Sequence, residues 1–190
     1  EFIYTNLKHF SVLEDKRFYD HAILIDSTSK RYSLCGARIG FIVSKNSEFI
    51  ETCLKFALTR LSPPTLALIA ANEALNSDKN YIKNVITEYS NRRKVLITEL
   101  SKLQDIKYSD PMGAFYSIIK LPVKDAEEFA KFLLTDFSVN NESVMVSPAS
   151  GFYSSKDNGH DEIRIAFVLN SDKLKRAINI INLGLKEVTS

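Results

Sequence analysis

The spacing of apolar residues changes several times along the chain, and each spacing predicts a type of element. Residues 22–25 and 39–43 are short apolar runs rich in isoleucine, which is typical of buried strands. In residues 47–61 the apolar side chains recur at the period of an amphipathic helix. Two further helical runs follow at 65–76 and 81–103. This part of the chain is therefore expected to hold two strands, a helix and then a long helix interrupted near Ser77-Asp78.

Helix-ending residues separate these runs, and the pattern changes again after Gln104. Pro63 and Pro64 cannot lie inside a helix, but Pro64 can open the next one. Arg92-Arg93-Lys94 is expected on the solvated face of a helix. Beyond Gln104, strands are predicted within 111–119, 144–148 and 163–168, and helices at 125–137 and 172–188. Their order, strand, helix, strand, strand and helix, predicts a small α+β layer.

Composition narrows the class of protein. The chain has 190 residues, of which 45% are hydrophobic and 25% charged, enough apolar material for one sizeable core or two small ones. The net charge of +2 gives no argument for nucleic acid or another polyanion. Cys35 and Cys53 lack the spacing of metal ligands or of a disulfide scaffold, and no apolar run has transmembrane length. We expect a soluble, cytoplasmic protein without a metal.

The most informative polar segment lies between the two predicted strands. It contains Lys30, Arg38 and the hydroxyl residues Ser27 and Ser29. A lysine amine can form a Schiff base when desolvation lowers its pKa, and an arginine can hold a phosphate through its planar guanidinium. Together they suggest a phosphorylated aldehyde cofactor. On chemistry alone the alternative stays open, because most lysines in polar loops are solvated surface charges.

The spacing within this segment is much more specific. Ser-x-Ser-Lys, five further residues and then Gly-x-Arg-x-Gly resembles the pyridoxal-phosphate lysine segment of class I/II aminotransferases, the aspartate aminotransferase superfamily. The resemblance implies that Lys30 bonds covalently to the cofactor and that Ser27, Ser29 and Arg38 hold its phosphate. Gly36 and Gly40 flank the arginine and are expected to permit tight backbone or close packing, although each is also compatible with an ordinary turn.

The resemblance also implies a fold and a division into domains. The expected fold is the α/β, aspartate aminotransferase-like fold of pyridoxal-phosphate-dependent transferases, here its carboxy-terminal portion. Residues 1–62 would be the remnant of the large cofactor-binding domain, and residues 63–103 a long connecting helical region. Residues 104–190 would form the small carboxy-terminal α+β domain.

Two aromatic residues match further motifs of the family. Tyr4 matches the tyrosine of an Asp-x-x-Tyr motif that contacts the cofactor's phenolic oxygen, although Glu1 stands at the aspartate position. Phe115 lies in a Gly-Ala-Phe-Tyr strand whose phenylalanine borders the substrate pocket in the family. The alternatives remain open, since Tyr4 suits any strand and Phe115 suits any core.

Arg164 is the second charged residue on which the interpretation rests. Isoleucines on both sides place it on the opposite strand face from Ile163 and Ile165, and an arginine in so apolar a strand needs an anion. A carboxylate fits best, because it accepts two parallel hydrogen bonds. Arg164-Ile165-Ala166-Phe167 resembles the family's carboxy-terminal strand, whose arginine binds the substrate α-carboxylate. An ion pair with an internal Asp or Glu is the alternative.

The resemblance therefore implies a pyridoxal-phosphate-dependent aminotransferase, which moves an amino group between an amino acid and a 2-oxo acid. The expected amino acid is aspartate or glutamate. Lys30 would also carry the proton to and from the substrate Cα. A homodimer is expected. A carbon–sulfur lyase or an amino-acid decarboxylase of the same superfamily, and an inactive dimerising fragment, are the alternatives.

Overall fold

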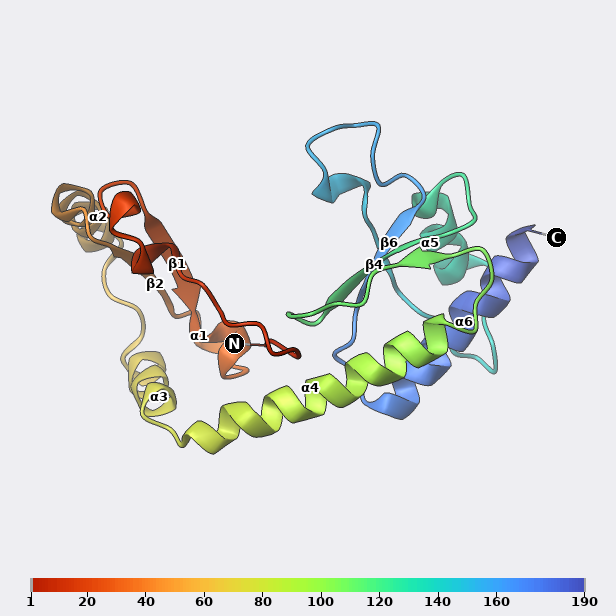
Figure 1. Ribbon diagram of the computed structural model, residues 1–190, viewed down its shortest axis with the longest axis horizontal. Coiled ribbons are helices and arrows are strands. Elements are labelled where there is room, and N and C mark those ends of the chain that lie inside the picture. Colours follow the sequence, from red (N-terminus) through yellow and green to blue (C-terminus); the bar gives the residue numbers. More distant parts are fainter. Residues whose placement is uncertain (1, 190) are drawn as a thin grey trace. The chain divides into compact units, whose positions relative to one another are not determined.

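The computed structural model describes residues 2–189, except the side chain of Lys79, so Glu1 and the motif position assigned to it lie outside the described residues. The chain forms two compact units (Figure 1). Unit 1 contains Asn6–Asn84, and unit 2 contains Phe2–Thr5 together with Val85–Ser190. The predicted domain division at 62 and 103 stays a prediction.

Unit 1 contains the two strands predicted on either side of the lysine segment. Strands β1 (Ile23–Ser27) and β2 (Gly40–Ser44) pair antiparallel. The prediction that they are buried is wrong for this chain, because Ile25 is 78% exposed and Ile42 is 50% exposed. Two strands are too few to cover each other's side chains.

The predicted helices of unit 1 are confirmed, with small changes at their ends. Helix α2 (Ser47–Arg60) starts where the side chain of Asn46 accepts a hydrogen bond from the Phe49 amide at 2.9 Å. The two prolines separate it from α3 (Thr65–Leu75), and α4 (Lys79–Leu100) follows and continues into unit 2. Two short 3₁₀ helices precede β1, η1 (Val12–Glu14) and η2 (Lys16–Phe18).

Unit 2 is built on a four-stranded antiparallel sheet with the order β3-β4-β6-β5. The sequence predicts its central strands β4 and β6 and its helices α5 and α6, but not the short β3, and only the end of 144–148 is a strand. The bounds are β3 Lys107–Tyr108, β4 Tyr116–Lys120, α5 Ala126–Thr135, β5 Ser147–Pro148, η4 Ser150–Phe152, β6 Glu162–Ala166 and α6 Ser171–Thr189.

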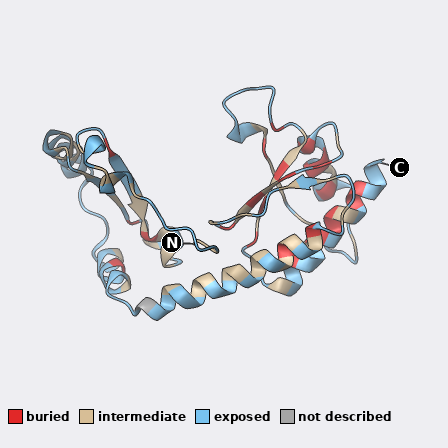
Figure 2. Cartoon of the chain, in the orientation of Figure 1, coloured by how far each residue is buried: buried red, intermediate tan, exposed pale blue. Residues whose placement is uncertain are grey.

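The main core belongs to unit 2, where the buried residues gather on the sheet and the facing sides of its helices (Figure 2). Ile163 and Ile165 point to this core from β6, and Arg164 between them is only half-buried, as the alternation predicts. Fully buried Phe167 follows the strand. Among residues 2–189, no helix is long and apolar enough to cross a membrane.

The expectation that Arg92 and Arg93 lie on a solvated face is wrong. Their side chains are only 17% and 15% exposed. Arg92 donates a hydrogen bond to the carbonyl of Val168 at 2.5 Å, and Arg93 donates to the carbonyl of Pro111 at 2.6 Å and pairs with Asp110. Both guanidinium groups satisfy backbone carbonyls that a helix-period pattern does not reveal.

Candidate cofactor and carboxylate-binding residues

The lysine segment begins at the end of β1, where Ser27 caps a short helix. The hydroxyl of Ser27 accepts a hydrogen bond from the Ser29 amide at 3.3 Å and so starts α1 (Thr28–Arg31). Lys30 lies on this helix and is exposed. The helix is short because its polar residues have little apolar surface to bury, and Tyr32 ends it.

Backbone pairing brings the two ends of the segment together. Ser27 is directly opposite Gly40 in the β1–β2 pair. Thr28 is buried, and its amide and hydroxyl donate to the carbonyl of Ile39 at 3.2 and 3.4 Å. Arg38 directly precedes Ile39. The hydroxyl residues, Lys30 and Arg38 therefore all lie at the same end of the β1–β2 pair.

The two glycines beside Arg38 differ. A Cβ on Gly40 would lie 3.2 Å from the carbonyl oxygen of Asp26, which confirms the predicted close packing. A Cβ on Gly36 would meet nothing within 4 Å, so the prediction of close packing is wrong there. Arg38 itself has a left-handed backbone with φ 57°, and its guanidinium donates to the carbonyl of Cys35 at 2.9 Å.

The donor set of this segment fits a phosphorylated carbonyl compound. Lys30, Arg31 and Arg38 are the cations of residues 26–40, and Asp26 is their single acid. The carboxylate of Asp26 is paired with Arg31 at 2.7 Å. The segment therefore keeps an excess of positive charge beside two hydroxyls, which suits a phosphate, and its lysine supplies an amine for an aldehyde.

Arg164 lies on an inner strand of unit 2, opposite Ile118 of β4 and Ser147 of β5. Its guanidinium carbon is 4.3 Å from the ring centre of Phe152 and 4.7 Å from that of Tyr116. The alternative of an internal ion pair is not found, because no carboxylate among residues 2–189 pairs with Arg164.

Tyr4 and Phe115 also belong to unit 2. The hydroxyl of Tyr4 donates to the carbonyl of Ala114, and its amide donates to the carbonyl of Met112 at 3.0 Å. Burial raises the pKa of Tyr4 to about 12, although the charge of Arg93 opposes the change. Phe115 is 8% exposed and belongs to the core. Their predicted roles toward cofactor and substrate stay predictions.

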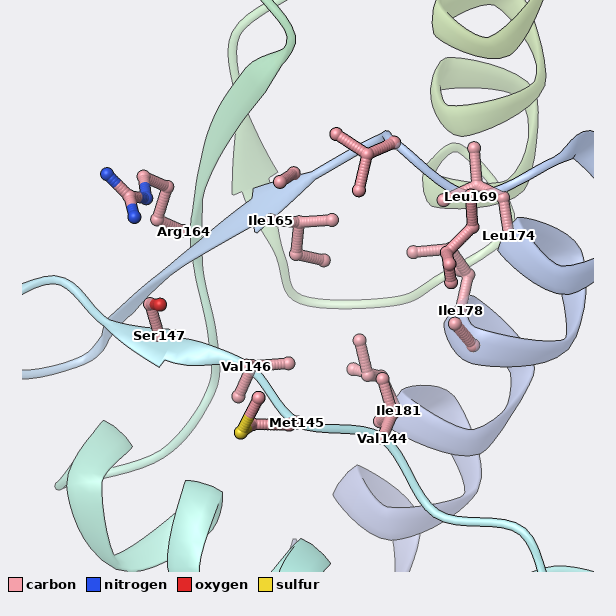
Figure 3. Close-up of a pocket in the computed structure, with 13 residues that line it drawn as sticks. Val144, Met145, Val146, Ser147, Arg164, Ile165, Leu169, Leu174, Ile178 and Ile181 are labelled. Carbon is pink, nitrogen blue, oxygen red and sulfur yellow. The ribbon is translucent and has the colours of Figure 1, made fainter. Parts of the chain in front are cut away.

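A cavity of about 320 Å³ lies between β6, α6 and the segment before β5 (Figure 3). Ile165 and Ile178 point into it, whereas the guanidinium of Arg164 points away from its centre. Its lining is otherwise almost entirely apolar, so it offers no group for acid–base chemistry. The part of the chain that the structure describes also contains no cluster of residues suited to a metal ion.

The sequence did not reveal the two aromatic neighbours of Arg164. Phe152 comes from η4 in a loop, and Tyr116 comes from the adjacent strand β4. Tyr116 and Ile118 share the strand face of Arg164 because side chains alternate, but this relation needs the β4–β6 register. The available signal was the aromatic pair Phe152-Tyr153 in a segment rich in Gly and Ser.

Comparison with known proteins identifies the family. The profile of the aminotransferase class I and II family matches residues 1–181. The chain belongs to this family. The aspartate aminotransferase of Pyrococcus horikoshii is 29% identical over 189 residues, which cover 97% of this chain and 46% of that protein. The glutamate–pyruvate aminotransferase AlaC of Escherichia coli is 30% identical over 188 residues, covering 94% of this chain and 42% of that protein.

Solved structures confirm the predicted α/β aminotransferase fold. An aromatic aminotransferase from Pyrococcus horikoshii OT3 has a TM-score of 0.85 and 26% identity, with 99% of this chain and 49% of that chain covered. The α-aminoadipate aminotransferase LysN of Thermus thermophilus was solved with N-(5'-phosphopyridoxyl)-L-leucine. It has a TM-score of 0.83 at 19% identity, and the match covers 98% of this chain and 48% of that chain. This class I/II aminotransferase chain spans about half the length of the curated relatives it matches.

Proposed function

We propose that this chain acts in a pyridoxal-phosphate-dependent aminotransferase, which transfers an amino group between an amino acid and a 2-oxo acid. The observation that carries the proposal is the lysine segment of unit 1. Its hydrogen bonds and strand pairing hold Ser27, Lys30 and Arg38 at one end of the β1–β2 pair. The family supports the same chemistry, and a solved relative binds a phosphopyridoxyl amino acid.

Each residue of the segment has a definite role in this proposal. The hydroxyls of Ser27 and Ser29 and the guanidinium of Arg38 hold the phosphate, and Lys30 bonds to the cofactor aldehyde. Pyridoxal phosphate, when bound, supplies an electron sink for the substrate. Once the amino group of the substrate had displaced Lys30 from the cofactor, the freed amine of Lys30 would take the proton from the substrate Cα and return a proton.

Residues of unit 2 act on the substrate and on the cofactor ring. Arg164 binds the substrate α-carboxylate through its N–H groups, which fixes the direction of the Cα–H bond. Tyr4 donates to the phenolic oxygen of the cofactor, which requires its hydroxyl to exchange the carbonyl of Ala114 for that oxygen. Phe115 borders the substrate pocket. We also propose that the protein is cytoplasmic and, by the family resemblance, a homodimer.

The amino-acid substrate is proposed to be aspartate or glutamate. Several relatives near 29% identity are aspartate aminotransferases, and AlaC is a glutamate–pyruvate aminotransferase. A carbon–sulfur lyase or a decarboxylase would share the lysine and both arginines. Product analysis separates them, because an aminotransferase makes a new amino acid only when a 2-oxo acid acceptor is present.

The first test is an absorption spectrum of the 190-residue chain after addition of pyridoxal phosphate. We expect a visible band that Lys30→Ala abolishes and that Lys55→Ala, at an exposed lysine of α2, leaves unchanged. Borohydride reduction and peptide mapping should locate the adduct on Lys30. Labelling spread over surface lysines, or no band at all, would show that the chain alone does not hold the cofactor, as expected of an inactive dimerising fragment.

A further inference from the structure

The surroundings of Arg164 contain aromatic rings and not the internal ion pair that was the alternative prediction. The guanidinium carbon lies over the rings of Phe152 and Tyr116, at 4.3 and 4.7 Å from their centres. An aromatic face attracts the cation and shields it from water, but it offers no carboxylate to neutralise it. In the described part of the chain, the Arg164 guanidinium has no hydrogen bond to an acceptor and no ion pair with an acid. The Arg164 side chain is not fully buried. Its N–H groups are therefore available to an external anion.

One nearby carboxylate is held by another partner. Glu162 is two residues before Arg164 on β6, so the two side chains share a face of the sheet. The carboxylate of Glu162 accepts a hydrogen bond from the Tyr153 hydroxyl at 2.5 Å. This bond also raises the pKa of Tyr153. The acid that could most simply neutralise Arg164 is thus fixed by a tyrosine.

The loop that carries Phe152 and Tyr153 is anchored at several points. The amide of Ala149, which is fully buried, donates to the carbonyl of Glu162 at 2.8 Å. The hydroxyl of Ser150 donates to Glu127 of α5 at 3.1 Å. Gly159 lies so close to the ring of Tyr153 that a Cβ there would be 2.6 Å from it. These contacts fix the loop although the ring of Phe152 is itself 54% exposed.

We propose that Phe152 and Tyr116 are positioning residues that hold the guanidinium of Arg164 ready for a carboxylate, while Tyr153 keeps Glu162 away from it. This inference rests on the proposed function, because it explains how the α-carboxylate of the substrate is bound. The rings limit the rotamers of a long side chain before the ligand arrives, so less side-chain entropy is lost on binding. They also lower local hydration, which strengthens the charged hydrogen bonds that follow.

Carboxylate binding can be measured directly on the 190-residue chain, without cofactor. The probe is acetate, with acetamide as an uncharged control of the same shape, and the signal is the side-chain Nε–H resonance of Arg164 in ¹⁵N-arginine-labelled protein. Arg164→Lys assigns the resonance. We expect a saturable acetate-dependent shift, a rise of the acetate Kd by about three- to tenfold in Phe152→Leu and in Tyr116→Leu, and faster exchange of the Nε–H proton. Acetamide should cause no shift.

Phe132→Leu is the matched control, because it removes a half-buried ring of α5 that packs against Phe129 and Phe137. It should leave the acetate Kd unchanged, and circular dichroism should show that all variants stay folded. Equal Kd values and equal Nε–H exchange in Phe152→Leu and the parent chain would overturn the inference, as would the absence of any acetate shift at Arg164. Acetate binding without a Lys30-dependent band would instead count against the proposed function and leave this inference standing.

Discussion

We expect Gly159→Ala to destabilise the loop that carries Phe152 and Tyr153 beside Arg164. Gly159 has φ +78°, a backbone conformation that alanine adopts only with strain. A Cβ there would lie 2.6 Å from two atoms of the Tyr153 ring and 3.1 Å from the carbonyl carbon of Ala149. The first contact forces the ring to move, and the second opposes movement of the backbone instead.

The size of the effect follows from these contacts. Holding alanine in the left-handed region costs about 1–2 kcal/mol. Displacing the Tyr153 ring also breaks its exposed hydrogen bond to Glu162, which frees that carboxylate. The free energy of unfolding of unit 2 should therefore fall by about 1–2 kcal/mol. Because Phe152 precedes Tyr153, the Nε–H resonance of Arg164 should shift as well.

Gly151→Ala provides a control in the same loop. A Cβ at Gly151 meets nothing within 4 Å, so its effect on stability should stay within about 0.5 kcal/mol. Urea unfolding followed through amide resonances of β4 and β6 measures unit 2 by itself. If Gly159→Ala is as stable as Gly151→Ala and keeps the Arg164 resonance in place, the steric reasoning is refuted.

The helices of this chain could be predicted because their signals are local. The apolar residues of 47–61 recur at helical spacing, and Pro63 and Pro64 separate α2 from α3, so sequence and structure agree to within a few residues. The short strand β3 was missed because Lys107 and Tyr108 pair with β4 across the sheet and have no periodic signal of their own.

Burial and side-chain partners were harder to predict because they depend on distant parts of the chain. Ile25 looks like a core residue by composition, yet nothing in a two-stranded sheet covers it. Arg93 looks like a surface charge by its helical neighbours, yet it reaches the carbonyl of Pro111. In both cases tertiary structure overrides a local pattern.

The candidate site shows the same division. Lys30 and Arg38 were chosen as candidates because their motif lies within one short segment, and the face of Arg164 was predicted because strand side chains alternate. The rings of Phe152 and Tyr116 beside Arg164 were not found, because a loop and a neighbouring strand bring them there. The charged candidates could be chosen from local sequence, whereas the aromatic neighbours of Arg164 required the tertiary structure.

Three further substitutions test the core, a half-buried arginine and a half-buried tyrosine. Phe167→Ala removes a fully buried ring and should cost unit 2 about 3–5 kcal/mol in urea unfolding. Arg93→Leu leaves the carbonyl of Pro111 without its donor and should cost about 1–3 kcal/mol in the same assay; no change would show that water replaces the guanidinium. Tyr4 has a pKa raised from 10.0 to about 12, so the folded state binds its proton more tightly than the unfolded state. Its contribution to stability should be complete below pH 10 and lost as the pH rises toward 12. Tyr4→Phe should make the stability profile flatter in that alkaline window, and parallel profiles for the two proteins would contradict a raised pKa.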